Sequence, residues 1–126
     1  MISNRICAFA LSAAFAILSS AQPAIAAPFD GNWSMLAVTT SGHCGKIKID
    51  LGVSHGLIHS TGGKFAFHRI QLAGRVSDSG QVKMNAVAGP RIAKGTGRFV
   101  RSRGSGTWSG TGPSGICTGV WSAVRS

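Results

Sequence analysis

Turn signals recur at even intervals along most of this chain, and the segments between them are short and alternate between apolar and polar residues. Such alternation is typical of β-strands with one buried face. Turns at intervals of about 8–12 residues are typical of an all-β meander. The pattern predicts eight strands, at residues 33–37, 47–53, around 57, 64–77, 82–88, 92–101, 104–108 and 117–123.

The fourth of these segments changes the parity of its apolar residues. Phe65 and Phe67 share one parity, whereas the apolar positions from Ile70 to Val76 follow the other. A shift of one residue moves side chains to the opposite face of a sheet. We therefore expect a bent strand with a β-bulge or corner near His68 that keeps both sets inward.

The composition supports a fold made of strands. The sequence contains 18 Gly, no Tyr and only three acidic residues. Helix surfaces are normally rich in Glu, Lys, Gln and Arg, so few charges together with abundant Gly, Ser, Thr and Val favour strands. We predict an all-β fold: a small eight-stranded antiparallel up-and-down meander that forms a closed or flattened barrel. Strands of about seven residues would leave an interior that side chains can fill.

The N-terminal segment is typical of a secretory signal peptide. Residues 1–5 carry one positive charge, residues 6–18 are almost wholly apolar, and Ala24-Ile25-Ala26 fits the small-x-small cleavage pattern. An apolar run of this length is too short to span a hydrocarbon core about 30 Å thick. We predict a signal peptide over residues 1–26, a single β-barrel-like domain over residues 27–126, and a periplasmic or extracellular location.

Two cysteines, Cys44 and Cys117, follow the predicted cleavage site. Free thiols are poorly tolerated outside the cytosol, so we predict one disulfide rather than two unpaired buried thiols. In an eight-stranded up-and-down barrel the last strand pairs with the first, and its beginning lies beside the end of the first strand. Both cysteines then lie at the same rim, which favours a closed barrel.

A Gly-x-Trp motif ending at Trp33, together with Arg125 after the last strand, resembles the structural signature of the calycin barrels. These barrels include lipocalins, avidins and bacterial metalloprotease inhibitors, and in them an arginine near the C-terminus packs over the first-strand tryptophan. The resemblance implies structural roles for Trp33 and Arg125. Gly-x-Trp recurs at Trp108 and Trp121, which we expect to have structural roles as well.

More of the chain resembles a group of small exported proteins of rhizobia and their relatives. The pattern of that group reads Phe-Asp-Gly-x-Trp, Gly-x-Cys, Gly-Arg-Val, Gly-x-Gly-Arg, Gly-x-Gly-x-Trp and Cys-x-Gly-x-Trp. It matches here at residues 29–33, 42–44, 74–76, 95–98, 104–108 and 117–121. The resemblance covers nearly the whole predicted mature chain, and it implies the fold and export but no activity.

Few residues offer catalytic chemistry. With no Glu, and with Asp30, Asp50 and Asp78 on separate elements, two carboxylates are not expected in one cleft. No Gly-x-Ser-x-Gly sequence is expected on a strand-to-helix turn. His55 and His59 flank a turn and would share a face, but no further ligand stands at a spacing diagnostic of Zn²⁺ or Cu²⁺. We expect a protein that is not an enzyme, with no cofactor and no metal site.

Positive charge is the most informative functional feature. The formal net charge of the chain is +10. Five cations without a neighbouring acid concentrate within thirteen residues: Arg91, Lys94, Arg98, Arg101 and Arg103. We expect them to form a basic rim or stripe, which either binds an anionic polymer or only keeps the protein in solution.

These features predict a non-catalytic exported protein that binds anionic envelope or extracellular polymers through a basic surface. The candidate partners are lipopolysaccharide, anionic polysaccharide and, without sequence specificity, nucleic acid. Two alternatives stay open: a calycin-like inhibitor of a secreted protease, and a barrel that binds a small ligand. An open lumen would favour the small ligand, whereas a filled barrel with a basic stripe would favour the polyanion.

Overall fold

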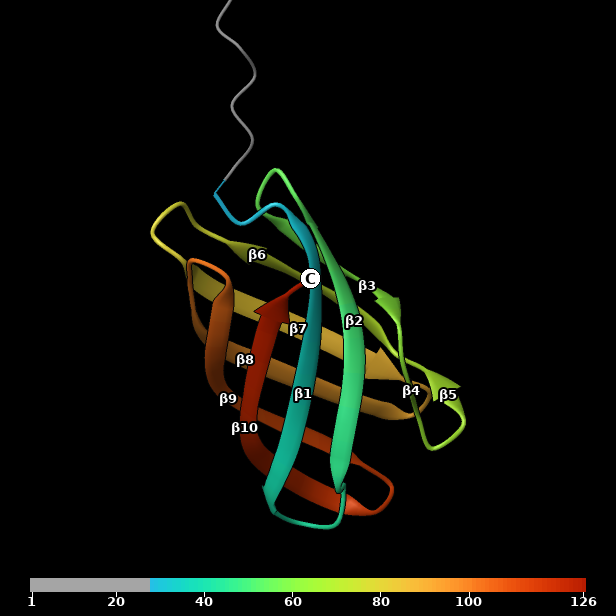
Figure 1. Cartoon of the computed structure of the whole chain (residues 1–126). Coiled ribbons are helices and arrows are strands. Elements are labelled where there is room, and N and C mark those ends of the chain that lie inside the picture. Colours follow the sequence, from blue (N-terminus) through green and yellow to red (C-terminus); the bar gives the residue numbers. More distant parts are fainter. Residues whose placement is uncertain (1–27) are drawn as a thin grey trace, which may run out of the picture.

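The computed structural model describes residues 28–126, and the predicted signal peptide lies outside the described residues. Ten strands and no helix are found in this range (Figure 1). None of the described residues therefore belongs to a helix that could cross a membrane. The strands are β1 Gly31–Ser41, β2 Lys46–Ser54, β3 Leu57–Gly62, β4 Lys64–Phe65, β5 His68–Arg69, β6 Gln71–Val76, β7 Gln81–Ala88, β8 Arg91–Val100, β9 Arg103–Gly112 and β10 Gly115–Arg125.

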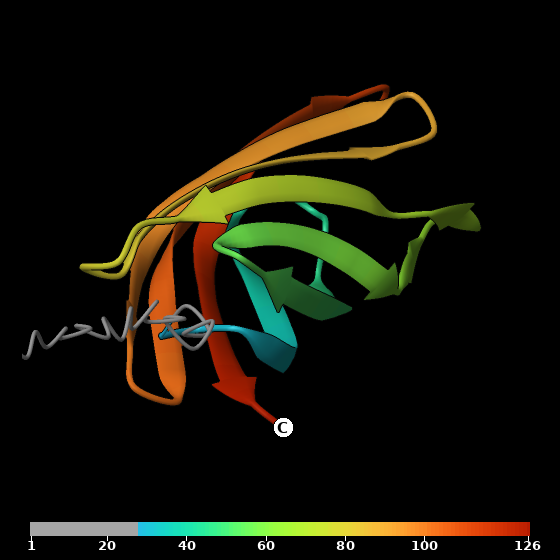
Figure 2. The same cartoon turned by 90° about the horizontal axis from the view of Figure 1, so that it is seen from above.

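Eight of these strands close into one barrel, in the order β1-β10-β9-β8-β7-β6-β3-β2. Each strand pairs antiparallel with its neighbours, and β10 closes the barrel against β1, where Trp33 lies opposite Arg125. In Figure 1 the front strands β10, β1 and β2 cross the back strands β7 and β8 obliquely, and Figure 2 shows the same walls from above. The predicted closed, up-and-down antiparallel barrel is confirmed.

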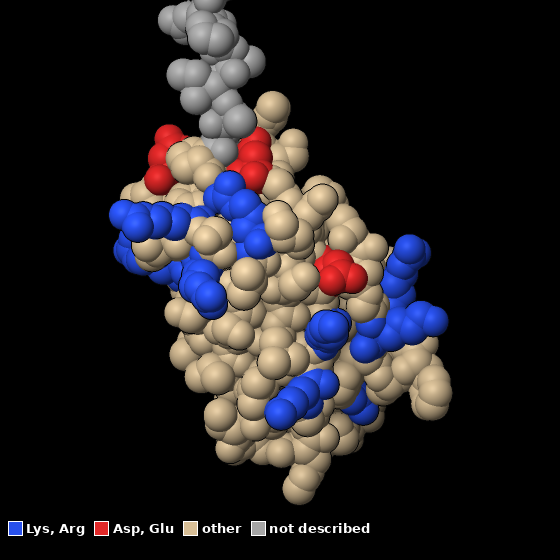
Figure 3. Space-filling view, in the orientation of Figure 1, with Lys and Arg blue, Asp and Glu red and all other residues tan. Residues whose placement is uncertain are grey.

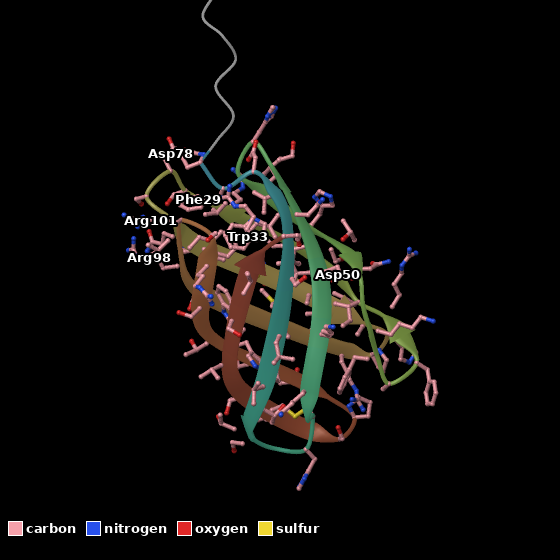
Figure 4. The ribbon with its side chains drawn as sticks, in the orientation of Figure 1. Phe29, Trp33, Asp50, Asp78, Arg98 and Arg101 are labelled. Atoms are coloured by element: carbon pink, nitrogen blue, oxygen red, sulfur yellow. A yellow bond between two sulfur atoms is a disulfide. The ribbon has the colours of Figure 1, made fainter. Side chains whose placement is uncertain are left out.

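The predicted disulfide is confirmed as well. Cys44 lies between β1 and β2, Cys117 lies near the start of β10, and their sulfur atoms are 2.02 Å apart. The bond is visible at the lower end of the barrel in Figure 4. We call this end of the barrel the disulfide end. The opposite end, where β1 begins and β10 finishes, we call the Trp33 end.

Aromatic side chains fill the lumen at the Trp33 end. The rings of Trp33 and Phe99 stack with centroids 4.1 Å apart, and Phe29 and Trp121 meet Phe99 edge-on. The Trp33 ring N–H donates a hydrogen bond to the Phe29 carbonyl oxygen at 2.9 Å. The guanidinium of Arg125 lies over the Trp33 ring, 5.0 Å from its centroid, and closes the stack from outside. The contact between Arg125 and Trp33 is the one that the resemblance to the calycin barrels implied.

Two glycines on neighbouring strands make room for Trp121. A Cβ atom on Gly97 would stand 2.5 Å from the Trp121 ring, and one on Gly106 would stand 2.7 Å from its ring nitrogen. Gly97 and Gly106 are also opposite each other in the β8–β9 ladder. The two glycines therefore allow the large ring of Trp121 to pack directly against the backbone of β8 and β9. Glycine inside a strand normally weakens that strand.

The predicted bent strand over residues 64–77 is wrong. β4 and β5 instead form a separate two-stranded hairpin, and the barrel strand β6 starts only after it. The hairpin turn consists of Ala66 and Phe67, whose φ values are 50° and 70°. This turn reverses the chain at the change of parity, so no bulge is needed. Phe65 faces the barrel opening, whereas Phe67 points away into solvent.

Candidate functional site

The lumen is filled at the Trp33 end but hollow toward the disulfide end. A cavity of about 110 Å³ opens there. Strands β9 and β10 are 10 and 11 residues long, longer than the strands predicted at 104–108 and 117–123, so the barrel wall extends beyond the aromatic stack. The walls of the cavity are almost entirely apolar and include Met35, Ile49, Leu72, Met84, Trp108 and Trp121.

Small residues in one level of the barrel create the hollow. Ala86 on β7 lies opposite Ala93 on β8, and Ala93 lies opposite Gly110 on β9. All three line the cavity, and none has a side chain longer than a methyl group. The wall formed by β7, β8 and β9 therefore stands clear of the apolar side chains that β1, β2 and β6 turn into the lumen.

Trp108 contributes a polar atom to this apolar surrounding. Its ring lines the cavity, and its ring nitrogen is buried against Gly119, where a Cβ atom would come within 2.9 Å. This N–H group has no hydrogen-bond acceptor among the described residues. An unsatisfied buried donor costs about 1–3 kcal/mol, so such groups often mark a site for a water molecule or a ligand.

Arg91 lies at the mouth of the cavity. Its guanidinium is over the ring of Phe65, 4.7 Å from the centroid, and its side chain lines the cavity. Its aliphatic stem packs on Gly112, where a Cβ atom would stand 2.5 Å from Cγ. Arg91 has the same inward parity along β8 as the buried Phe99. The first residue of the predicted basic cluster thus belongs to the lumen and not to the outer surface.

The structure divides the rest of the predicted cluster. Lys94 and Arg98 point outward from β8, Arg101 lies in the β8–β9 turn with a φ of 58°, and Arg103 begins β9. Arg98 donates a hydrogen bond to the Ser79 carbonyl oxygen at 2.9 Å. In Figure 4 Arg98 and Arg101 lie together near the Trp33 end, below Asp78.

Strand pairing adds two cations that the sequence analysis missed. Lys83 on β7 lies directly opposite Arg75 on β6. On its other side, Gln81 and Asn85 are opposite Arg98 and Lys94, which makes those two cations the diagonal neighbours of Lys83. All four side chains are exposed, and Arg75 and Lys83 also line a groove on the outer wall. We call Arg75, Lys83, Lys94 and Arg98 the outer basic patch.

Residues 28–126 contain the side chains and the sequence pattern that were considered for metal binding and for a nucleophilic serine. No three His, Cys or Asp side chains of this range gather closely enough to hold a metal ion. The sequence Gly-x-Ser-x-Gly does occur at residues 52–56, but it crosses the β2–β3 hairpin and leads into no helix. The carboxylate of Asp30 accepts hydrogen bonds there from the backbone N–H groups of His55 and Gly56, at 2.9 and 3.3 Å.

Comparison with models of known protein families finds no match, and comparison with curated protein sequences finds none either. Three features of the described residues can therefore guide a functional assignment. They are the apolar cavity, the cation at its mouth and the outer basic patch.

Proposed function

We propose that this protein is an exported binding protein for a small amphipathic molecule, held with its apolar part in the lumen and an anionic group at Arg91. The observation that carries the proposal is the apolar cavity of about 110 Å³ at the disulfide end. Ligand sites are typically concave and apolar, with a few polar groups that fix orientation. An engineered dry cavity of about 150 Å³ binds benzene, so a small ring or a short alkyl chain suits this volume.

Arg91 supports an anionic head group. A guanidinium presents several N–H donors in a planar fork, which fits a carboxylate, sulfate or phosphate. Two of the three acidic residues lie at the opposite end of the barrel: Asp30 binds the backbone of the β2–β3 turn, and Asp78 is labelled at that end in Figure 4. Figure 3 shows red groups at this end. The third, Asp50, is exposed on β2 opposite Gly62. An anion at the mouth therefore meets Arg91 with little competition from carboxylates.

The head group can be tested with two probes that share one alkyl chain, octanoate and octan-1-ol. We expect Arg91→Gln to weaken octanoate binding about tenfold or more, because a hydrogen bond to a charged group contributes about 1.5–3 kcal/mol. Octanol binding should stay within about twofold, since the alcohol lacks the charge. Isothermal titration calorimetry measures both affinities. Lys46→Gln, a cation exposed on β2 at the same end, is the control.

Equal loss of both probes in Arg91→Gln would show that Arg91 only supports the shape of the mouth. Equal loss of octanoate in Lys46→Gln would show that the net charge of this end is sufficient. If neither octanoate nor octan-1-ol bound to the unaltered protein, the proposed function itself would be overturned.

A second candidate function, binding of an anionic polymer, is favoured by one observation in the outer basic patch. Arg75 and Lys83 are directly opposite in the β6–β7 ladder, and like charges in that relation destabilise a sheet. A bound polyanion would remove this repulsion, because its phosphates or carboxylates would lie between the cations. Lipopolysaccharide, anionic polysaccharide and nucleic acid all offer such groups. The patch lies on the outer wall, so this function and ligand binding in the lumen are compatible.

A further inference from the structure

The tip of the β4–β5 hairpin combines two features that cost stability. Phe67 is 100% exposed, the highest value among the large hydrophobic residues. Ala66 and Phe67 both have positive φ, in a two-residue turn where Asn and Gly are strongly preferred. Eight glycines take up positive φ elsewhere in the described residues, yet none is placed in this turn. Strain and exposure of this kind persist where a function requires them.

Contacts with the barrel rim fix the position of the hairpin. At its base the Ile70 N–H donates a hydrogen bond to the Gly63 carbonyl oxygen at 3.0 Å. Arg91 covers Phe65, and the His68 ring lies where a Cβ atom of Gly89 would stand, 2.5 Å from Cγ. The hairpin is thus attached to the β7–β8 turn and to the mouth of the cavity. Phe67 is held out beside that mouth.

Further exposed apolar side chains lie at the same end of the barrel. Val87 on β7 is opposite Ile92 on β8, and Thr111 on β9 is opposite both Ile92 and Ile116 of β10. Val87, Ile92 and Ile116 are 44%, 58% and 68% exposed. These three residues and Phe67 form what we call the apolar collar, which extends along the outer wall from the mouth of the cavity.

Cations accompany the collar. Lys64 and Arg69 are directly opposite each other in the hairpin and both are exposed. This like-charge pairing is unfavourable unless an anionic partner is present. In Figure 3 blue side chains gather at the right, on the side where Figure 1 shows β4 and β5. The disulfide end therefore presents apolar side chains and positive charge together.

We propose that the disulfide end docks on an anionic lipid surface, with Phe67 in the interfacial layer and Lys64 and Arg69 at the phosphate groups. Aromatic side chains are favoured at the boundary between lipid headgroups and acyl chains, and basic residues beside them bind anionic headgroups. Exposed apolar side chains with cations beside them suit such a layer, because its acyl boundary takes up apolar groups and its anionic headgroups attract Lys and Arg. Docking would bring the mouth of the cavity to a source of amphipathic molecules. The docking proposal rests only on the hairpin and the apolar collar, and it does not depend on ligand binding in the lumen.

The test is co-sedimentation of the mature protein with vesicles. Vesicles of phosphatidylcholine and phosphatidylglycerol in equal parts should bind the protein, and vesicles of phosphatidylcholine alone should bind it much less. Phe67→Ser should lower the partition coefficient about tenfold or more, because it removes the largest apolar group from the interface. Lys64→Gln and Arg69→Gln should each lower it about fivefold. Leu57→Ser, at the Trp33 end and 51% exposed, is the matched control and should bind as the unaltered protein does.

Phe67→Trp supplies a positive readout. This variant should keep vesicle binding, and the fluorescence of its added indole should shift to shorter wavelength on anionic vesicles. The proposal would be overturned if Phe67→Ser bound vesicles as well as the unaltered protein, or if Leu57→Ser lost as much vesicle binding as Phe67→Ser. It would also be overturned if the fluorescence of the added indole in Phe67→Trp did not shift. A dimer of the unaltered protein in solution that becomes monomeric in Phe67→Ser would also overturn it, since a second copy would then cover the collar. Octanoate binding without vesicles should be unaffected by Phe67→Ser, which separates this proposal from the proposed function.

Discussion

Trp33 makes three kinds of contact that together seal one end of the barrel. It stacks on Phe99, donates a hydrogen bond to the Phe29 carbonyl oxygen and lies under the Arg125 guanidinium. Only 1% of its surface is exposed. Phe29 precedes β1, Phe99 is on β8 and Arg125 ends β10, so a single side chain connects three distant parts of the chain.

Loss of this side chain should be among the most damaging single changes. We expect Trp33→Ala to lower the free energy of unfolding by about 3–5 kcal/mol, because truncation of a buried aromatic residue loses burial and leaves a cavity. Urea denaturation followed by circular dichroism measures the change. Leu36→Ala, at an outward position of the same strand, should cost less than about 1 kcal/mol. A loss below about 1 kcal/mol in Trp33→Ala would contradict its role as the anchor of this end.

Single residues were predictable from sequence where pairing and burial agree. The Cys44–Cys117 disulfide was predicted from export and from the two cysteines that follow the predicted cleavage site, and the pairing of β1 with β10 brings both to one rim. The inward orientation of Arg91 was not predicted. Its neighbour Ile92 is apolar and suggests the buried face, yet Ile92 is 58% exposed. Along β8 the parity is set by Phe99, eight residues away, and not by local hydrophobicity.

At the level of elements, the β4–β5 hairpin is the main departure from the predicted strands. The sequence signal for a two-residue hairpin turn is Asn or Gly at positions with positive φ, and residues 66 and 67 are Ala and Phe. The parity change was visible in the sequence. Its cause was not, because a bulge and a strained hairpin leave the same pattern of apolar residues.

The outer basic patch also arises between elements. Arg75, Lys83 and Arg98 are distant in sequence and come together only through the register of β6, β7 and β8. Local charge density therefore indicated residues 91–103, which the structure distributes over the mouth, the outer wall and the Trp33 end. A basic outer surface was predictable from the net charge, but the residues that form the outer basic patch were not.

Duplex DNA serves as a convenient polyanion for testing this patch. Each neutralised phosphate contributes about −0.9 to the slope of log affinity against log salt, so three or four contacts predict a slope near −3. The triple variant with Ser at positions 75, 83 and 98 should bring the slope close to zero, because it removes most of the contacts. Fluorescence anisotropy at several salt concentrations measures it.

The control triple variant replaces Lys46, Lys48 and Lys64, which lie outside the patch, by Ser. It removes the same number of charges and should retain most of the slope. An equal loss of slope in both triple variants would mean that only net charge matters. An unchanged slope in the first would mean that the patch takes no part in binding.

The molecule as a whole has two unlike ends. The Trp33 end is filled by aromatic rings and carries Asp30 and Asp78, whereas the disulfide end is hollow and apolar at its mouth. Cations lie at both ends. The disulfide joins residues 73 apart in sequence at the hollow end. In the chain-entropy model a loop of this length stabilises a fold by roughly 4 kcal/mol, which offsets the packing that the cavity lacks.

The barrel was predictable from periodicity, whereas the lumen was not. Alternating apolar residues determine which face of each strand turns inward, and the cysteines support closure. Whether side chains fill the lumen depends on which inward residues of different strands lie at the same height along the barrel axis. Ala86, Ala93 and Gly110 meet in one level only through strand register, so the hollow that they create has no signature in any single segment.

Filling the lumen tests the central claim most directly. Ala93→Leu places a larger apolar side chain in the cavity, and Ala73→Leu makes the same change on the exposed face of β6. Isothermal titration calorimetry with octanoate should give one site per chain in the unaltered protein and in Ala73→Leu, and at least about tenfold weaker binding in Ala93→Leu. Octanoate binding that is unchanged in Ala93→Leu, in a variant that unfolds cooperatively, would contradict ligand binding in the lumen.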